Sequence, residues 1–138
     1  MAGYSTTPLS KKLVIKPGNT LALLHAPHGF SETLEPLPEE VTLLDELELM
    51  GSCDRIVAFY ISMEQLEKEL PLLREALTSD GRLWLAWPKR ASRLPTDLCD
   101  GVVRDLGLES GLVDVKVCAI DETWSGLCFM FRLKDRPT

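Results

Sequence analysis

The sequence has no apolar run long enough to cross a membrane, and its amino-terminal residues contain no hydrophobic signal core. Positive charge is also in deficit, because 15 Lys and Arg residues stand against 21 Asp and Glu residues, for a formal net charge of -6. A negatively charged chain is a poor match for the phosphate backbone of nucleic acids. We therefore predict a cytoplasmic protein with neither a membrane nor a nucleic-acid partner.

Cysteine is scarce, and no two of the four cysteines form a C-x-x-C pair. Cys118 and Cys128 fall within apolar strand patterns, where cysteine usually packs as a small hydrophobic side chain. Cys53 and Cys99 stand apart from any second cysteine in the sequence. We expect all four thiols to be reduced and structural, so neither a disulfide nor a zinc site is predicted.

The sequence also lacks the motifs by which common enzyme classes are identified. It contains no glycine-rich phosphate-binding loop, and its Ser, His and Asp residues have no spacing that identifies a catalytic triad. The motifs alone assign no reaction, so a prediction of function has to come through the fold.

What the sequence does contain is enough apolar residues for one folded domain. The chain is 138 residues long, 45% hydrophobic and 26% charged, which is ordinary for a globular protein. A chain of this length buries roughly 68% of the surface that its unfolded form exposes. We expect a single domain over residues 1–138, with residues 1–7 loosely held because they carry few apolar side chains.

The stretch from Asp54 to Lys89 organises the predicted fold. An apolar strand at Arg55–Ile61 is followed by a helix that begins with Ser62 and Gln65 in a capping-box pattern. A second apolar strand follows at Arg82–Trp87. Two apolar strands joined by a helix predict a right-handed βαβ unit in a parallel sheet.

The predicted helix of this unit has one apolar face, formed by Leu66, Leu70, Leu73 and Leu77. Because proline lacks the N–H that a helix interior requires, we expect Pro71 to produce a kink or to divide the helix into two segments. The residues Ser79-Asp80-Gly81 are expected to end the helix in a turn. Shorter elements are expected at residues 8–13 (helix), 31–34 (helical turn) and 47–50 (turn or helix).

Shorter strands and a hairpin complete the predicted sheet. Thr20–His25 is continuously apolar and Val41–Leu44 follows it, as is typical of strands buried in a parallel sheet. Near the carboxyl terminus, Leu112–Ile120 and Cys128–Leu133 alternate apolar and polar residues, which predicts an antiparallel hairpin. A helix capped by Thr96 precedes the hairpin. The predicted fold class is α/β: a three-layer, mostly parallel, Rossmann-like sheet with a C-terminal antiparallel hairpin.

In the order of these elements the chain resembles the class I S-adenosylmethionine-dependent methyltransferases. Leu13–Leu21 is similar to the lead-in of the first strand of that superfamily, and Leu73–Trp87 is similar to a helix-to-strand segment late in it. The resemblance implies a methyltransferase-like fold and S-adenosylmethionine as a possible ligand. It also implies that an acid after the second strand, Asp45 or Glu46, is placed to bond a ribose.

The chain departs from the methyltransferase pattern in two places. Where those enzymes carry a glycine-rich turn after the first strand, the stretch His25–Phe30 keeps only Gly29, and Pro27 removes an N–H donor. Only two strands are predicted before Asp54, whereas the full fold has three. These departures predict a cofactor site that is cut down or lost, so no cofactor is established.

A second resemblance is more specific and runs from end to end of the chain. It is to a family of small bacterial proteins of unknown function. The stretches that carry it are Ala2–Ser5, Pro8-Leu9, Lys11–Leu13, Trp87–Lys89, Thr96–Leu98, Gly111–Asp114 and Trp124–Leu127. This resemblance implies a bacterial protein and brings no activity with it.

The first candidate ligand site follows the first two predicted strands. His25, His28 and Gly29 come after the first strand and Asp45 after the second, and open α/β sheets bind ligands at these carboxyl ends. The spacing of the two histidines also fits a pair of metal ligands. Because no acid or third ligand lies near them in sequence, we predict a polar turn and no metal site.

The second candidate site is the basic loop after the Arg82–Trp87 strand. Lys89, Arg90, Ser92 and Arg93 precede a predicted helix start, and cations at such a place suit a phosphate or a carboxylate. A solvated basic loop with no ligand has the same sequence. An anionic small molecule is therefore one of two interpretations of this loop.

These observations leave three classes of function open. The leading hypothesis is a non-catalytic binding or regulatory domain on a degenerate methyltransferase-like fold, because the glycine-rich turn is missing. The alternative is a small S-adenosylmethionine- or nucleotide-binding enzyme that uses a crevice between the loops at residues 25–30 and 88–95. A third is a subunit that binds a protein partner or forms a homo-oligomer. Fold analogy does not choose among them, since one fold hosts many functions.

Overall fold

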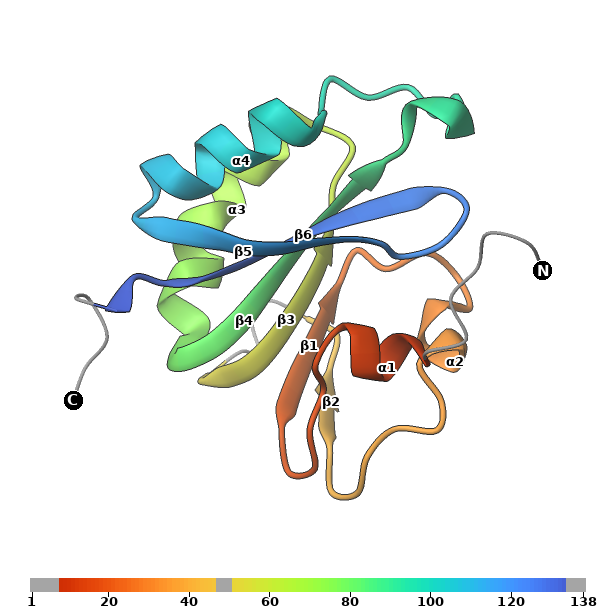
Figure 1. The fold of residues 1–138 in the computed structure, drawn as a ribbon, viewed down its shortest axis with the longest axis vertical. Helices are drawn as coiled ribbons and strands as arrows, with labels where there is room; N and C mark the ends of the chain where they lie inside the picture. The colour runs from red at the N-terminus through yellow and green to blue at the C-terminus, as the bar shows by residue number, and fades with distance from the viewer. Residues whose placement is uncertain (1–7, 47–50, 134–138) are drawn as a thin grey trace.

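The computed structural model describes residues 8–46 and 51–133, which form one sheet with helices on both of its faces (Figure 1). The expected element at residues 47–50 and the amino-terminal residues 1–7 lie outside the described residues. The strands are β1 (Thr20–Leu24), β2 (Thr42–Leu44), β3 (Cys53–Phe59), β4 (Leu77–Pro88), β5 (Leu112–Ala119) and β6 (Trp124–Phe131). The helices are α1 (Leu9–Lys12), α2 (Phe30–Thr33), α3 (Met63–Ala76), α4 (Asp100–Glu109) and the 3-10 turn η2 (Arg90–Ser92).

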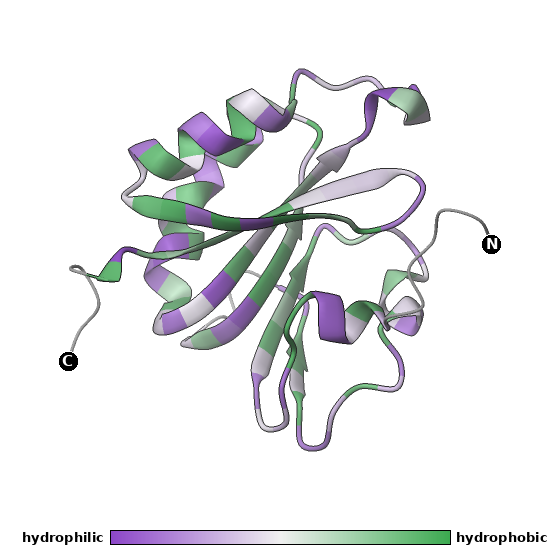
Figure 2. Ribbon diagram, in the orientation of Figure 1, coloured by the Kyte–Doolittle hydropathy of each residue, from purple (hydrophilic) through white to green (hydrophobic). Residues whose placement is uncertain are grey.

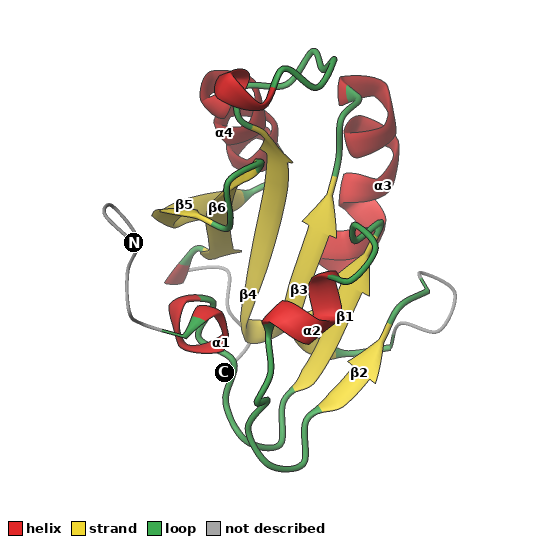
Figure 3. Ribbon diagram, turned by 90° about the vertical axis from the view of Figure 1, so that its right-hand side faces the viewer, coloured by secondary structure: helices red, strands yellow, loops and turns green. Residues whose placement is uncertain are grey.

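The strands lie in the order β2-β1-β3-β4-β6-β5. The pairs β1–β2, β1–β3 and β3–β4 are parallel, whereas β6 pairs antiparallel with both β4 and β5. Figure 3 shows the arrowheads of β1, β2, β3 and β4 pointing the same way. The α/β class, the mostly parallel sheet and the carboxyl-terminal hairpin are therefore confirmed, and within the described residues two strands precede β3, as predicted.

Helix α3 begins at the predicted cap, where the Gln65 backbone N–H donates to Ser62 Oγ at 3.3 Å. Of the two outcomes predicted at Pro71, division of the helix is wrong, because α3 continues through this residue to Ala76, whereas a kink stays a prediction. Pro71 lies on the exposed face of α3, where water can bond the carbonyl that the proline leaves without a helical partner. Tertiary packing of the leucine face then holds the helix together.

Strand β4 begins earlier than predicted, at Leu77, so Ser79-Asp80-Gly81 is not a separate turn. The register with β3 passes from Cys53↔Leu77 to Arg55↔Arg82, which shows that β4 carries extra residues in a bulge. A Cβ on Gly81 would lie 2.7 Å from Leu77 Cδ1 and 3.1 Å from the Asp54 carbonyl oxygen. The glycine is thus required by close packing inside a strand rather than by a turn.

Helix α4 starts at Asp100, four residues later than the predicted cap at Thr96. Thr96 instead donates from Oγ1 to the Ile61 carbonyl at 2.7 Å, and Asp97 Oδ1 accepts from the Met63 N–H at 2.8 Å. Both residues therefore tie the loop before α4 to the start of α3. Asp97 therefore caps α3 and not α4.

The two faces of the sheet are covered unequally. Helices α3 and α4 cover one face, and the other is covered by α1, α2 and the segment that carries Leu13 and Ile15 (Figure 1). On this second face, Trp84 Nε1 donates to the Leu13 carbonyl at 3.1 Å, and Arg55 Nε donates to the Val14 carbonyl at 2.6 Å. Two side chains of the sheet therefore hold an extended segment against this face, and no long helix covers it within the described residues.

Hydropathy follows these layers. Figure 2 shows the middles of β1, β3 and β4 as mainly hydrophobic, with hydrophilic residues at the amino ends of β3 and β4. The four cysteines are free; Cys53 and Cys128 are buried, Cys118 is half-buried and Cys99 is exposed. Trp124, expected in the hairpin loop, is the first residue of β6, and its ring packs edge-on against Phe59 with centroids 5.1 Å apart. Among the described residues, no helix has the length and apolar character needed to span a membrane.

Candidate functional site

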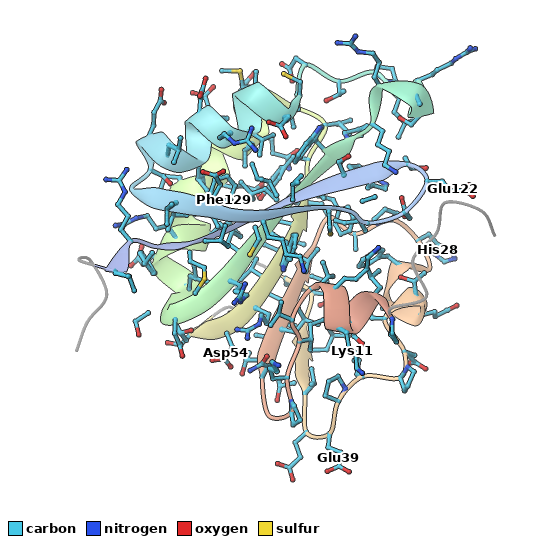
Figure 4. The ribbon with its side chains drawn as sticks, viewed as in Figure 1. Lys11, His28, Glu39, Asp54, Glu122 and Phe129 are labelled. Carbon is cyan, nitrogen blue, oxygen red and sulfur yellow. The ribbon has the colours of Figure 1, made fainter. Side chains whose placement is uncertain are left out.

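The carboxyl ends of β1, β3 and β4 lie along one edge of the sheet. Figure 1 shows the loop into α2, the turn η2 and the tip of the β5–β6 hairpin along this edge. In Figure 4, His28 and Glu122 mark this side of the molecule and Asp54 the opposite one. The chain moves outward from β1 to β2 and then returns to β3 on the other side of β1. Such a reversal of strand order is where open α/β sheets bind ligands.

A cavity of about 370 Å³ opens beside the end of β1, and we name it the β1 cavity. It brings together three of the predicted site residues, His25, Gly29 and Asp45. Its other lining residues are Leu23, Ala26, Pro27, Phe30, Ser31 and Leu43. His28 is exposed and does not line this cavity, so the structure does not join the two histidines in one site.

The wall of the β1 cavity is a loop with an unusual backbone. His25 has a φ of 56° and Gly29 a φ of 81°, both in the left-handed region that non-glycine residues rarely adopt. Phe30 is buried and packs edge-on against Phe59 with centroids 4.8 Å apart, and its N–H donates to the Pro27 carbonyl at 3.0 Å. The loop therefore holds its shape by tertiary packing, and the strain at His25 is of the kind found at functional sites.

His25 is the end of a polar network that links β1, β3 and α3. Glu69 Oε1 accepts from His25 Nε2 at 2.8 Å and from the Tyr60 hydroxyl at 2.7 Å, and Glu69 Oε2 accepts from Gln65 Nε2 at 3.1 Å. None of Tyr60, Gln65 and Glu69 was predicted as a site residue, although Gln65 was predicted as part of the α3 cap. The available signals were that Tyr60 directly follows β3 and that Gln65 and Glu69 are four residues apart on the polar side of α3.

The geometry of the network selects one tautomer of a neutral His25. Its Nε2 is closest to the Glu69 carboxylate, which can only accept, so the ring proton belongs on Nε2. Gln65 Nε2 also lies 3.4 Å from His25 Nε2, but two donors facing each other form no hydrogen bond. The lone pair is therefore on Nδ1, and the side chain of His25 is 43% exposed.

The network also sets the charges of its acidic members. Burial raises the pKa of Glu69, but the hydrogen bonds from His25, Tyr60 and Gln65 outweigh it, so the pKa lies below its usual range. Burial and the bond to Glu69 raise the pKa of the Tyr60 hydroxyl above its ordinary value. At neutral pH Glu69 is therefore a carboxylate that accepts hydrogen bonds from three side chains.

A second cavity of about 530 Å³ opens beyond the end of β4, and we name it the β4 cavity. The predicted basic residues Lys89, Arg90 and Arg93 line it, together with Trp87, Pro88, Leu94, Thr96, Leu98, Cys99, Asp100, Val117 and Ser125. Ser92 does not line it, because its Oγ donates to the Lys89 carbonyl at 2.6 Å and accepts from the Leu94 N–H at 3.3 Å. Ser92 therefore shapes the loop and is not placed to contact a ligand in this cavity.

The two cavities share no residue and belong to opposite faces of the sheet. Leu23 and Phe30 of the β1 cavity belong to the core under α1 and α2, whereas Trp87 and Leu98 of the β4 cavity belong to the core under α3 and α4. Within the described residues, the loops at 25–30 and 88–95 therefore line two different cavities, and the crevice between them stays a prediction.

The structure offers little to a metal ion. Within residues 8–46 and 51–133, no three His, Cys, Asp or Glu side chains come together as a possible metal site. His25 and Asp45 line the same cavity, but they are only two such residues there. A small third cavity of about 330 Å³, lined by Ser62, Glu64, Gln65, Lys68 and Glu69, lies on the α3 side of the polar network.

No family model matches the sequence, and no curated protein matches it. Solved structures do match. A SAM dependent methyltransferase from Aquifex aeolicus superimposes with a TM-score of 0.66 at 15% identity, over 88% of this chain and 87% of that one. A TehB-like SAM-dependent methyltransferase from Corynebacterium glutamicum gives 0.59 at 12% identity, over 95% and 91% of the two chains.

Magnesium protoporphyrin IX methyltransferase from Synechocystis, solved with bound SAM, gives a TM-score of 0.62 at 12% identity, over 90% of this chain and 74% of that one. At these identities the likeness shows the fold alone. The resemblance to the class I methyltransferase fold is therefore confirmed. The resemblance to a family of small bacterial proteins stays a prediction.

Proposed function

We propose that this protein, built on the methyltransferase-like fold, is a non-catalytic binding domain whose β1 cavity takes the nucleoside part of an S-adenosyl compound. The observation that carries the proposal is the meeting of Asp45 and Gly29 in one cavity at the carboxyl ends of β1 and β2. An acid at the end of the second strand is well placed to accept hydrogen bonds from ribose hydroxyl groups. A cavity of about 370 Å³ is within the range of small-molecule sites.

The residues present fit the nucleoside better than the amino-acid end of S-adenosylmethionine. Pro27 has no N–H to offer, and α2 is only four residues long. The side chains of Ala26 and Pro27 carry no charge to hold an amino or carboxyl group. Methyl transfer requires the methyl donor and its acceptor to be held in a fixed relative orientation. Ala26, Pro27 and the short helix α2 offer few contacts that could hold the methyl-bearing end of the ligand. We therefore expect the β1 cavity to bind the nucleoside part of the ligand without supporting methyl transfer.

The polar network favours a second candidate, an enzyme that uses His25 as a base. A histidine whose Nε2–H is held by a carboxylate presents Nδ1 as a proton acceptor, which is the arrangement of many general bases. Tyr60 and Gln65 would then keep Glu69 in place. In the non-catalytic interpretation the same bonds anchor the strained His25 backbone to α3. The two interpretations differ in whether replacing His25 abolishes a reaction.

Calorimetric titration with S-adenosylhomocysteine and S-adenosylmethionine tests the proposal. Thermal unfolding in the presence of ligand gives a second readout. Ligand at a hundred times its dissociation constant stabilises the folded state by about 2.7 kcal/mol, which raises the midpoint of unfolding by roughly 10 °C for a domain of this size. We expect Asp45→Ala to weaken binding at least tenfold and Glu46→Ala to leave it unchanged. Both acids are exposed, but only Asp45 lines the cavity. If neither compound binds, the proposal is contradicted.

A turnover assay separates binding from catalysis. The purified protein is incubated with S-adenosylmethionine and with mixtures of small-molecule methyl acceptors, and S-adenosylhomocysteine is measured over hours. We expect no S-adenosylhomocysteine above the level of a protein-free control. Release of S-adenosylhomocysteine that disappears in His25→Ala would overturn the non-catalytic proposal in favour of the enzyme.

A further inference from the structure

The β4 cavity is lined by three cationic side chains and one acidic side chain. Lys89, Arg90 and Arg93 line it, and among the ion pairs of the described residues none involves these three. The one acid in its lining, Asp100, is paired with Arg104. Three positive charges therefore gather on one cavity of a chain whose formal net charge is -6.

The loop that carries these cations is held by its own backbone. The Lys89 N–H donates to the Thr123 carbonyl of the hairpin at 2.7 Å, and the Lys89 carbonyl accepts from the Ser92 N–H at 3.0 Å. The Arg93 N–H donates to the Arg90 carbonyl at 3.1 Å, and Arg93 has a φ of 62°, in the left-handed region. Fixing the loop before a ligand arrives lowers the entropy that binding has to offset.

Part of the lining of the β4 cavity is apolar. Trp87 and Leu98 reach it from the core under α3 and α4, and Val117 reaches it from β5 with 55% of its surface exposed. A free inorganic ion would leave this wall in contact with water. A ligand with an apolar body would cover it, and an aromatic body would suit a wall built around a tryptophan.

We propose that the β4 cavity binds an organic anion, with a phosphate or carboxylate group held by Lys89, Arg90 and Arg93 and an apolar body against Trp87, Leu98 and Val117. Guanidinium groups match both anions in a two-pronged geometry, so the shared chemistry is a planar or tetrahedral oxyanion. The first turn of α4 also faces the cavity through Cys99 and Asp100. The site is independent of the β1 cavity and of the function proposed for it.

Nuclear magnetic resonance titration of the full chain tests the site with four probes: inorganic phosphate, phenyl phosphate, benzoate and, as a blank, sodium chloride at matched ionic strength. We expect saturable shifts of the Trp87 indole, the Val117 methyl groups and the amides of residues 88–99. Phenyl phosphate should bind more tightly than inorganic phosphate because of the apolar wall. Comparison of phenyl phosphate with benzoate tells whether the site prefers phosphate or carboxylate.

Three single variants and one control complete the experiment. Lys89→Gln, Arg90→Gln and Arg93→Gln each remove one charge, and we expect each to weaken phenyl phosphate binding by about tenfold, as charge-assisted hydrogen bonds are lost. Lys11→Gln removes a charge on α1, on the other side of the sheet (Figure 4), and should change nothing.

The unliganded spectra of the variants report their folding directly. The proposal is overturned if the shifts fail to saturate, lie away from residues 87–99 and 117, or are the same in all three charge variants as in the wild type. The loop is then a solvated basic surface. Because the assay does not use an S-adenosyl compound, its failure leaves the proposal for the β1 cavity to its own test.

Discussion

The two cavities at the carboxyl edge of the sheet are built in different ways. The β1 cavity depends on contacts between side chains far apart in sequence, such as His25 with Glu69 and Phe30 with Phe59. The basic loop of the β4 cavity is held mainly by backbone hydrogen bonds within the loop and with the adjacent hairpin, and Thr96 ties the following segment to the Ile61 carbonyl. We therefore expect the β1 cavity to respond to changes in α3 and β3, and the β4 cavity to respond to changes in its own loop and in α4, whose first turn lines it.

The two faces of the sheet repeat this contrast. The face under α3 and α4 is covered by two regular helices, of 14 and 10 residues. The face under α1 and α2 is covered by two helices of four residues each and by an extended segment held by Trp84 and Arg55. The second face is therefore covered by less regular structure, and we expect the bonds from Trp84 and Arg55 to the extended segment to contribute substantially to its stability.

The largest effect is expected for Trp84→Ala. Trp84 is fully buried under α1, and its indole N–H bonds the Leu13 carbonyl. Loss of the ring should lower the free energy of unfolding by about 3–5 kcal/mol, measured by urea denaturation. Trp84→Phe keeps most of the packing and should cost less than half as much. A loss below 1 kcal/mol for Trp84→Ala would show that the extended segment is not an important support.

An intermediate effect is expected for Gly107→Ala on the opposite face. Gly107 lies inside α4 against β6, and a Cβ there would overlap the Phe129 ring. We expect a loss of about 1–3 kcal/mol from overpacking, despite the better helix propensity of alanine. Gly101→Ala is the control, because no atom lies within 4 Å of its added Cβ and α4 should tolerate or gain from the change.

The Gly107→Ala variant also tests whether the two cavities bind their ligands independently. Displacement of α4 should weaken phenyl phosphate binding in the β4 cavity and leave S-adenosylhomocysteine binding in the β1 cavity unchanged. Equal loss of both ligands would show that the two sites are coupled through the sheet, against the separation that the structure shows.

The polar network should give stability that depends on pH. The pKa of Glu69 is lowered from its ordinary value of 4.5, so its hydrogen bonds stabilise the folded state above about pH 4.5, and this contribution is lost as the pH falls through the folded-state pKa. Glu69→Gln should cost roughly 1–2 kcal/mol at pH 7, and this cost should decrease as the pH falls below 4.5, measured by urea denaturation. Glu67→Gln, an exposed neighbour on α3, should show neither effect.

The Tyr60 hydroxyl should make the stability of the folded state depend on pH in the alkaline range as well. Its pKa is raised from the ordinary value of 10.0 by burial and by the bond to Glu69, so it stabilises the folded state below about pH 10 and this contribution declines as the pH rises further. Tyr60→Phe should remove that alkaline decline while costing about 1 kcal/mol at pH 7. An unchanged alkaline decline in the variant would assign it to another group.

The smallest effect is expected for Asp97→Ala. Asp97 accepts from the Met63 N–H and so caps α3 from a loop that lies after β4. Loss of this cap should cost about 1 kcal/mol and lower the thermal midpoint by a few degrees. Asp105→Ala, an exposed acid on α4, serves as the control. A stability unchanged by Asp97→Ala would mean that Ser62 alone caps α3.

Much of the fold could be predicted because its signals are local. The continuous apolar run at Thr20–Leu24 and the alternation within Leu112–Ala119 each identify a strand without reference to distant residues. The boundaries that were wrong depend on tertiary structure. Asp97 caps α3 from across a loop, Thr96 donates to the Ile61 carbonyl just before α3, and the bulge at Gly81 lets β4 keep register with β3.

The candidate site was predictable only in part, for the same reason. Asp45 and Gly29 follow strands, and the carboxyl edge of a parallel sheet gathers such residues. Glu69 is 44 residues from His25, so its part in the site appears only when α3 packs beside the end of β1. That the loops at 25–30 and 88–95 open on opposite faces likewise depends on which way each side chain points from its strand.

The proposed function depends on whether the β1 cavity binds an S-adenosyl compound through Asp45. Titration of the ¹⁵N-labelled protein with S-adenosylhomocysteine, followed residue by residue, measures this binding at the site itself. We expect saturable shifts of the amides at residues 23–30 and 43–46, which are lost in Asp45→Ala and kept in Glu46→Ala. An absence of shifts, or shifts centred on residues 87–99, would show that the β1 cavity does not bind the compound.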